Sequence, residues 1–549
     1  MTLNKKHSFF ASISLLFVVV MIAFGCAVQT KPQGGPKDVV PPKLIKATPA
    51  NQTHSFSSKI IQLDFDKFFK LSNQFQEITI TPAPEKQPDY NYTKKPKSLI
   101  ITLKDTLQKN TTYVINFGKS IVDLHEGNVL KNFTYVFSTG THIDSLSISG
   151  KVIDIHTQDR EKDVTVMLFS LKQDSLLFGK KKPSIYTTTD TAGNFNISNL
   201  HEGIYKLYAL KEATANKIYD NESELIGIPN KIINLQNDTT GILLKLFKQI
   251  PTQFRFLERP RFDLDGKILL TFNKPLEKPA VRIISPVAQN EDKYVLISKT
   301  RDTALVYVKN MDFDSIKLVV FDNNKPIDTT TLRKLRKESF VRTVSLATSA
   351  DARLILKPTT DLTITSSTPI GTYDQSLIVL NEDSTTVDYT LQQDTTNLKR
   401  LTLNYKWKQK ANYTLTFNEG AITGFWGEKN KKMIKKFKLD KPENYSLLTL
   451  HITVPDTSKA YIIELLNEQS ALLQSNSIRK NTNFAYKNLL AGKYRVRVVY
   501  DDNKNGKWDT GSIKENRQPE NIWVDRDVIL VKPNFDTDQP VDIPREIIL

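Results

Sequence analysis

Apolar and polar residues alternate with a period of two along most of the chain. In the stretch KIIQLDF, the apolar residues Ile61, Leu63 and Phe65 are separated by single polar residues, and the stretch TTYVINF shows the same pattern. Such alternation is typical of half-buried strands. Sustained 3.6-residue periodicity is almost absent, and Asn, Asp, Gly and Pro separate the short runs. The pattern predicts an all-β chain of tandem β-sandwich modules.

The N-terminus breaks this pattern. The basic stretch NKKHS precedes an apolar run of 16 residues, Phe9 to Phe24. This run is too short for a confident transmembrane span and is typical of the apolar region of a secretory signal. We therefore expect residues 1–25 to be a signal peptide. Residues 26–40 are rich in Pro, Gly and Gln, a composition that favours a flexible tether.

The signal ends in the letters AFGC, which resemble a bacterial lipobox. The resemblance implies cleavage before Cys26 and diacylglycerol on its thiol. Cys26 is the only cysteine in the 549 residues, so a disulfide framework and thiol catalysis are both excluded. An uncleaved anchor with an incidental cysteine is the alternative. No acidic cluster follows Cys26, which favours the periplasmic face of the outer membrane.

A chain of this length exceeds one hydrophobic core. The first expected module covers residues 41–140. Its opening, PPKLIKATPANQTHSFSSKIIQLDFDKFF, and its closing stretches, NTTYVINFGKSIVDLHEGN and FTYVFSTG, resemble bacterial Ig-like domains of the SbsA type. The resemblance implies a sandwich without catalytic residues.

The second expected module covers residues 143–247. The stretches ISGKVIDIHTQDREKDVTVMLFS and TTTDTAGNFNISNLHEGIYKLYAL resemble carboxypeptidase-regulatory or transthyretin-like sandwiches. A shift of 289 residues lays this module over the C-terminal segment 443–549. The identities are Asn194/Asn483, Phe195/Phe484, Asn199/Asn488, Leu200/Leu489, Gly203/Gly492, Tyr205/Tyr494, Asn216/Asn505 and Asp220/Asp509. These matches predict that one transthyretin-like sandwich occurs twice.

The first module also recurs. Tyr113, Phe117 and Gly127 match Tyr413, Phe417 and Gly427, which predicts a second Ig-like unit over 349–442. A weaker match from Gly266 onward predicts a third Ig-like unit over 251–345. Together the modules are similar to multidomain lipoproteins of Bacteroidota-type bacteria. The recurring pair Asp-Ser or Asp-Thr resembles the O-glycosylation signal of those bacteria, although such pairs are also ordinary turn formers.

The net charge of the chain does not by itself exclude a class of binding partner. Its 76 basic and 59 acidic residues give a formal net charge of +17. The basic residues are dispersed, whereas nucleic-acid binding usually needs a basic stripe. We therefore expect no nucleic-acid partner and interpret the lysines as a solubilising surface.

Motifs of catalysis are absent from the sequence. The seven histidines show no zinc-hydrolase spacing, and neither a nucleophile elbow nor a phosphate-binding loop occurs. Four tryptophans remain, of which Trp407 and Trp426 are candidates for glycan stacking. The alternative is that each ring packs in its own core or turn.

A candidate calcium loop lies in the stretch DDNKNGKWD. The side chains of Asp501, Asn503, Asn505 and Asp509 and the carbonyl of Lys507 occupy loop positions 1, 3, 5, 9 and 7, with Gly506 at the turn. The usual glutamate at position 12 is replaced by Ser512. The alternative is a type I′ turn at Asn505-Gly506. The other copy carries Lys217 at the glycine position, so we expect it to bind no calcium.

The sequence thus predicts a lipid-anchored envelope protein with a structural or protein-interaction role and without catalysis. Its expected partners are the membrane, through the anchor, and other envelope proteins. Calcium is the one cofactor considered. A glycan-binding lipoprotein of a polysaccharide-uptake system is the first alternative, and a hydrolase with an unrecognised carboxylate pair is the second.

Overall fold

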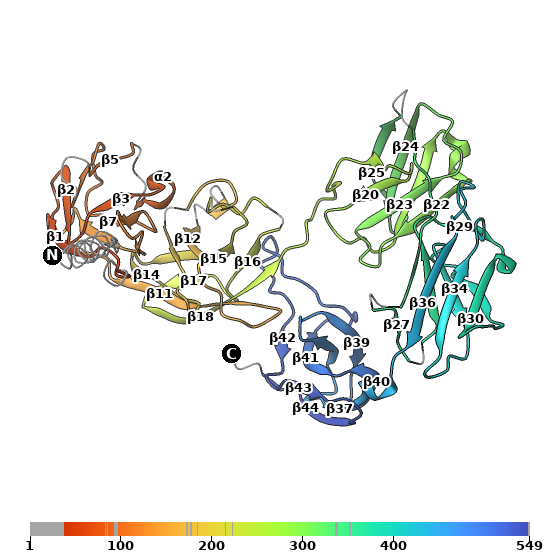
Figure 1. Ribbon diagram of the computed structural model, residues 1–549. Helices are drawn as coiled ribbons and strands as arrows, with labels where there is room; N and C mark the ends of the chain where they lie inside the picture. The colour runs from red at the N-terminus through yellow and green to blue at the C-terminus, as the bar shows by residue number, and fades with distance from the viewer. Residues whose placement is uncertain are drawn as a thin grey trace, which may run out of the picture. The chain divides into compact units, whose positions relative to one another are not determined.

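The computed structural model describes residues 38–546, except residues 83, 85, 93–96, 172, 173, 176, 177, 184, 215, 222, 335–338, 351, 352 and 359. Cys26 and its flanks lie outside the described residues. Strands make up nearly all of the regular secondary structure in the described chain (Figure 1), as the alternating pattern predicts. Within it, no helix has the length and apolar character needed to cross a membrane. The chain divides into two compact units at Ser145/Leu146.

The first unit holds the first module. Its elements are β1 (Leu44–Thr48), β2 (Ile60–Phe65), β3 (Phe69–Leu71), α2 (Gln74–Glu77), β4 (Thr79–Thr81), β5 (Asp89–Asn91), β6 (Ser98–Thr102), β7 (Thr112–Asn116), β8 (Ile121–Asp123), β9 (Val129–Leu130) and β10 (Thr134–Ser138). They form sheets in the orders β1-β2-β6-β5, β10-β7-β4 and β3-β8-β9. Ile61, Leu63 and Phe65 lie in its core, as their alternation predicts.

The fourth module repeats these pairings. Its elements are β26 (Leu346–Thr348), β27 (Ile355–Leu356), β28 (Leu362–Ser366), β29 (Ile370–Tyr373), η2 (Gln375–Leu377), β30 (Ile378–Glu382), β31 (Thr385–Thr386), β32 (Thr390–Gln393), β33 (Arg400–Asn404), β34 (Asn412–Phe417), β35 (Ile422–Gly424) and β36 (Met433–Leu439). The orders β26-β28-β33-β32, β36-β34-β30 and β29-β35 correspond to those of the first module. The core of the fourth module starts at Val344, ahead of the predicted 349.

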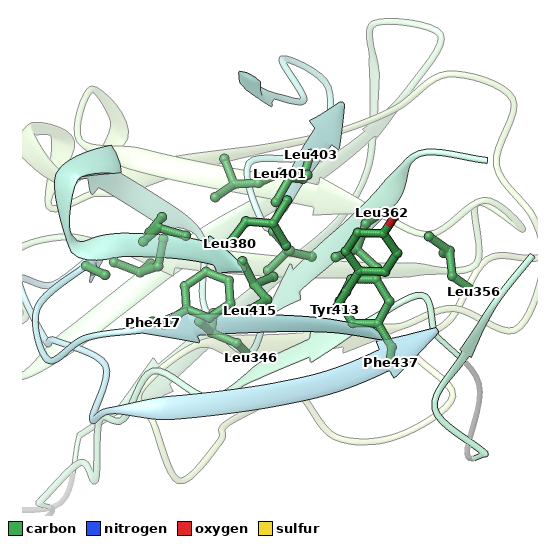
Figure 2. Packing of buried hydrophobic residues seen from close by; sticks show 14 of the residues in the cluster. Leu346, Leu356, Leu362, Leu380, Leu401, Leu403, Tyr413, Leu415, Phe417 and Phe437 are labelled. Atoms are coloured by element: carbon green, nitrogen blue, oxygen red, sulfur yellow. The ribbon is translucent and has the colours of Figure 1, made fainter. Parts of the chain in front are cut away.

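The residues that revealed this repeat hold the same structural positions in both copies. The hydroxyl of Tyr113 accepts a hydrogen bond from the backbone N–H of Gln108 at 2.8 Å, and that of Tyr413 accepts one from Lys408 at 2.6 Å. Figure 2 shows the Tyr413 ring beside Phe437 in the fourth core, where the two rings stack with centroids 5.6 Å apart. Each tyrosine thus fills a core and ties its own upstream loop.

The third module is a shorter version of the same sandwich. Its elements are β19 (Arg261–Phe262), β20 (Ile268–Thr271), β21 (Pro279–Ser285), η1 (Val287–Asn290), β22 (Lys293–Ile297), β23 (Thr303–Val308), β24 (Ser315–Asp322) and β25 (Lys325–Arg333). They form the sheets β19-β20-β23-β22 and β21-β24-β25. Asn323 and Asn324 both have positive φ, 48° and 62°, and close β24 onto β25 in a two-residue hairpin turn.

The second module has eight strands. They are β11 (Leu146–Asp154), β12 (Thr165–Ser170), β13 (Ile185–Thr188), β14 (Asn194–Leu200), β15 (Gly203–Lys211), β16 (Leu225–Gly227), β17 (Ile233–Leu235) and β18 (Thr239–Lys248). Strand β11 pairs with β14 and, in parallel, with β18, while β15 pairs with β12, β16 and β17.

The fifth module repeats the pairings of the second, except that, among the described residues, no pair corresponds to the one formed by β16 and β18. After η3 (Pro442–Asn444), its strands are β37 (Tyr445–Thr453), β38 (Ala460–Asn467), β39 (Leu472–Ile478), β40 (Thr482–Leu490), β41 (Gly492–Asp501), β42 (Ile522–Val524), β43 (Ile529–Val531) and β44 (Thr537–Asp542). Strand β37 pairs with β40 and, in parallel, with β44, while β41 pairs with β38, β42 and β43. The second and fifth modules are therefore two copies of one fold.

Candidate functional site

The candidate calcium loop follows strand β41, and its first carboxylate is buried. Asp501 is only 1% exposed. Its Oδ1 accepts the backbone N–H of Asn505 at 3.0 Å, and its Oδ2 accepts that of Gly506 at 2.9 Å. A carboxylate that accepts two backbone donors ties the loop to the end of the strand.

The other predicted side-chain ligands, Asn503, Asn505 and Asp509, are hydrogen-bonded to one another. The side-chain amide nitrogens of Asn503 and Asn505 both donate to Asp509 Oδ2, at 2.5 and 2.6 Å. The backbone N–H of Lys507 donates to the side-chain oxygen of Asn505 at 2.9 Å. The structure thus brings Asp501, Asn503, Asn505 and Asp509 into one network. Amide nitrogens face Asp509, so cation binding requires both amides to present oxygen instead.

The alternative of a type I′ turn at Asn505-Gly506 is wrong. That turn requires positive φ at both of its central residues. The described residues with positive φ in this loop are Lys504, at 62°, and Gly506, at 77°. The loop is instead held by side chains that bond to its own backbone.

A buried glutamate closes this loop. The carboxylate of Glu520, just before β42, accepts the backbone N–H of Asp502 and that of Asp509, each at 2.9 Å. Burial raises the pKa of Glu520, because desolvation disfavours its ionised form, while the backbone donors oppose that shift. Trp508 Nε1 also donates to the Glu520 carbonyl at 3.0 Å. Glu520 therefore fixes both ends of the candidate loop.

The second module contains the same closure. Glu224, 1% exposed, accepts the backbone N–H of Ala213 and that of Asp220, both at 3.3 Å. Asn216 Nδ2 donates to Asp220 Oδ2 at 2.9 Å, which matches the bond from Asn505 to Asp509. Glu224 and Glu520 thus perform the same role in both copies. The sequence comparison missed this pair because the loop of the fifth module is longer, so the ungapped alignment stops before it.

Lys217 replaces glycine in the second module without a change of backbone conformation. Its φ is 61°, against 77° for Gly506. The side chain is 4% exposed, and its ammonium nitrogen lies 5.1 Å from the centroid of the Tyr186 ring. A cation–π contact of this kind supplies positive charge from the protein itself.

A cleft of about 440 Å³ opens beside the candidate loop, within the second unit. Its walls include Asn230 and Lys245 of the second module and Asp502, Asn503, Asp509 and Glu520 of the fifth. Burial lowers the pKa of Lys245, whose ammonium donates to Asn521 Oδ1 at 2.7 Å. The candidate loop therefore lies where the two copies meet.

The two tryptophans predicted for glycan binding lie apart from this loop. The Trp407 ring packs in the fourth core with its centroid 4.9 Å from that of Tyr413. Its Nε1 is buried and has no hydrogen-bond partner among the described residues. Trp426 instead contacts the third module, where its Nε1 donates to the Val308 carbonyl at 2.8 Å. The Arg342 guanidinium lies 4.4 Å from the centroid of the Trp426 ring. The structure does not bring these two rings together as a platform, and glycan binding stays a prediction.

Side chains of other metal-binding types are dispersed. Across the described part of the chain, no three His, Cys, Asp or Glu side chains are grouped so that they could hold a metal ion. Among its predicted ligands, the candidate loop combines only two such side chains, Asp501 and Asp509, with asparagine and backbone oxygens, so calcium binding there stays a prediction.

A comparison with known protein families finds a match to the first module. The family model for a bacterial Ig-like domain matches residues 38–139. This confirms a bacterial Ig-like domain in this part of the chain, while its SbsA type and the bounds 41–140 stay predictions. The transthyretin-like and lipoprotein interpretations stay predictions. The comparison with curated proteins gave no match.

Several solved structures resemble the chain at low identity. BcpA, the major pilin subunit of Bacillus cereus, is 9% identical over 72% of this chain and 99% of its own, with a TM-score of 0.14. The S-layer protein rSbsC(31-844) is 11% identical over 86% of this chain and 67% of its own, also with a TM-score of 0.14. An L,D-transpeptidase from Mycobacterium smegmatis is 8% identical over 38% of this chain and 90% of its own, again with a TM-score of 0.14. Scores this low carry no argument about function.

Proposed function

We propose that this chain is a lipid-anchored envelope protein with a structural or protein-interaction role and no catalytic activity. The observation that carries this proposal is how the described modules use their apolar side chains. Each module has its own sandwich core, and a sixth cluster joins the second module to the fifth. Aromatic rings that are candidates for ligand stacking are used for packing within and between modules. Such contacts are expected of a scaffold that presents surfaces to partners.

The anchor in this proposal is Cys26. Its support is the apolar run before it, the lipobox-like letters AFGC and the exclusion of cysteine from the rest of the chain. Each buried CH₂ of an acyl chain contributes about 0.8 kcal/mol, so several chains on one cysteine hold a protein stably on a membrane. We assign the protein to the outer membrane, on its periplasmic face.

The expected partners are other envelope proteins. A bacterial Ig-like module at the anchored end of the chain and two copies of a second sandwich offer several separate surfaces. Glycan binding, the alternative role, depended on exposed tryptophan rings. The contacts of Trp407 and Trp426 with neighbouring side chains do not favour it.

The test of this proposal is the location of a Cys26→Ser variant. Without the acylated thiol, the protein is expected to move from the membrane fraction to the soluble periplasmic fraction. Gly25→Ala is the matched control, because alanine keeps a small residue at the cleavage site and should leave the protein on the membrane. If Cys26→Ser protein stayed on the membrane after a carbonate wash, the anchoring proposal would be wrong.

A further inference from the structure

The outer face of one sheet in the second module is apolar. Met167 on β12, Leu210 on β15 and Ile226 on β16 point away from the module's own core and belong to a separate cluster. Strand β12 is buried on both faces over most of its length. A strand covered on both faces needs a second layer on its outer side. Here that layer is the fifth module.

The equivalent sheet face of the fifth module forms the other side of this contact. Leu210 pairs with Ile226 on the neighbouring strand of its sheet, as Val499 pairs with Ile522 in the fifth module. All four side chains belong to the shared cluster. The two copies therefore meet through corresponding sheet faces, as two subunits do in a symmetric dimer.

The rim of this contact is hydrogen-bonded. The side-chain amide of Gln158 donates to the Ile522 carbonyl and accepts the N–H of Val524 at 3.4 Å, so one side chain covers the edge of β42. Thr510 Oγ1 donates to the Lys248 carbonyl at 2.6 Å, and Gln518 Nε2 donates to the Ile228 carbonyl at 2.8 Å. These bonds join residues more than 250 positions apart in the chain.

Close packing at Gly511 shows how tightly the faces fit. A Cβ atom at Gly511 would lie 2.5 Å from Cζ of Phe247, which is fully buried. The His156 ring likewise contacts Trp508, with centroids 4.5 Å apart. These contacts join the second module to Trp508 in the candidate calcium loop and to Gly511 just after it.

We propose that the second and fifth modules form an intramolecular clasp, a non-covalent pair that holds without the chain that connects them. Residues 249–444, which include the third and fourth modules, then form a closed excursion between the two halves of the clasp. In this clasp, the outer sheet face of each module binds the equivalent sheet face of the other module.

The test uses the full-length protein in mild detergent, with a protease recognition sequence inserted between Thr252 and Gln253. Both residues are exposed and precede β19, the first strand of the third module. After cleavage, only non-covalent contacts can hold the two fragments together. We expect the fragments to co-elute in size-exclusion chromatography at micromolar concentration. Separation of folded wild-type fragments, judged by unchanged β-type circular dichroism, would overturn the proposal.

Two variants separate the clasp from general stability. Val524→Glu places a carboxylate in the shared cluster and should release the fragments. Its matched control, Leu530→Glu, lies on β43 of the same sheet at a side chain that is 54% exposed, and should leave them together. Equal behaviour of these two variants would count against the clasp.

Gln158→Ala tests the other half of the contact. It removes the two hydrogen bonds to β42 and leaves the second module's own core intact. Loss of both bonds should speed fragment dissociation by about tenfold. A dissociation rate equal to that of the wild type would contradict the proposed role of this edge.

Discussion

The second and fifth modules share one strand arrangement and differ in the loop that follows β15 in one copy and β41 in the other. In both copies a buried glutamate accepts two backbone N–H groups across the loop, and an asparagine donates to an aspartate four residues later. In the second module Lys217 occupies the left-handed position, and in the fifth module Gly506 does. The glutamate tie thus forms whether the loop carries a lysine or a glycine.

This difference separates fold from added chemistry. The loop of the second module holds its own positive charge beside Tyr186, whereas that of the fifth combines two carboxylates with two amides and a glycine. The common feature is the glutamate tie, so the tie belongs to the fold. We expect calcium binding in the fifth copy alone.

Removal of the glutamate tie should have the largest effect. Glu224→Ala leaves three backbone donors without their partner and Glu520→Ala leaves two, at roughly 1–3 kcal/mol per donor. We expect local destabilisation of at least about 2 kcal/mol in each copy. Hydrogen-exchange mass spectrometry of the full chain measures it as lost protection in residues 212–227 or 501–524.

Glu468→Ala serves as the control for this prediction. Its carboxylate pairs with Lys493 on the surface, where both side chains are more than half exposed, so little change is expected. A response in one copy only would mean that the two loops are not equivalent.

Calcium should produce the next largest effect, in the fifth copy only. A dissociation constant on the order of 10⁻⁴ to 10⁻³ M is expected for a loop with few carboxylates and no position-12 glutamate. At about 10 mM calcium, mass action then stabilises the loop by about 1.4–2.7 kcal/mol. The measurement is calcium-dependent hydrogen exchange of residues 501–509 beside 212–220.

Exchanging the two residues at the left-handed position sharpens this test. Gly506→Lys should abolish the calcium response of the fifth copy, because an ammonium group opposes the cation. Asp501→Ala should abolish it as well, and the exposed Asp527→Ala should not. No protection by calcium in the wild-type loop would leave a purely hydrogen-bonded loop.

A smaller effect is expected from acid. Desolvation lowers the pKa of His156 below 6.5, and the nearby Arg497 adds to the shift, while Asp154 and Glu464 oppose it. The docked state therefore favours the neutral ring. The contribution of His156 to the stability of the docked state is fully present above pH 6.5 and is lost as pH falls through the lowered pKa.

The measurement for this prediction is the concentration at which the cleaved fragments dissociate, at pH 7.5 and at pH 5.5. Acid should weaken the wild-type pair, and His156→Gln should remove much of that dependence. Equal pH dependence in both proteins would assign the effect to other groups.

The sequence predicted the repeated sandwich well because the residues identical in both copies occupy positions with particular backbone or hydrogen-bonding requirements. Asn199 and Asn488 have left-handed φ values of 58° and 56°. The Tyr205 hydroxyl donates to the His201 carbonyl at 2.9 Å, and that of Tyr494 donates to the Leu490 carbonyl at 2.6 Å. Few residue types serve at such positions, so they stay recognisable after the surrounding residues have changed.

The candidate site was harder to predict than the repeated sandwich. The ligand residues lie in one short stretch, so their proximity follows from the sequence alone. Glu520 follows extra loop residues that the second module lacks. Glu224 and Glu520 are therefore not separated by the 289 residues that relate the other matched positions. Insertions of this kind hide equivalent residues from an ungapped alignment.

The contact between the two copies left a signal that alternation alone does not describe. The stretches TVMLFS and AYIIELLN contain near-continuous apolar runs, and the structure buries both faces of these strands. A continuous run predicts cover on two sides. It does not identify the covering element, because a second layer can come from any part of the chain.

The shared face also sets an order of events during synthesis. Ribosomes deliver the second module nearly 300 residues before the fifth. At about 5–20 residues per second, this leaves its apolar outer face uncovered for roughly 15–60 s. During that interval Leu210, Ile226 and Phe247 lack the cover that the fifth module gives them in the complete chain.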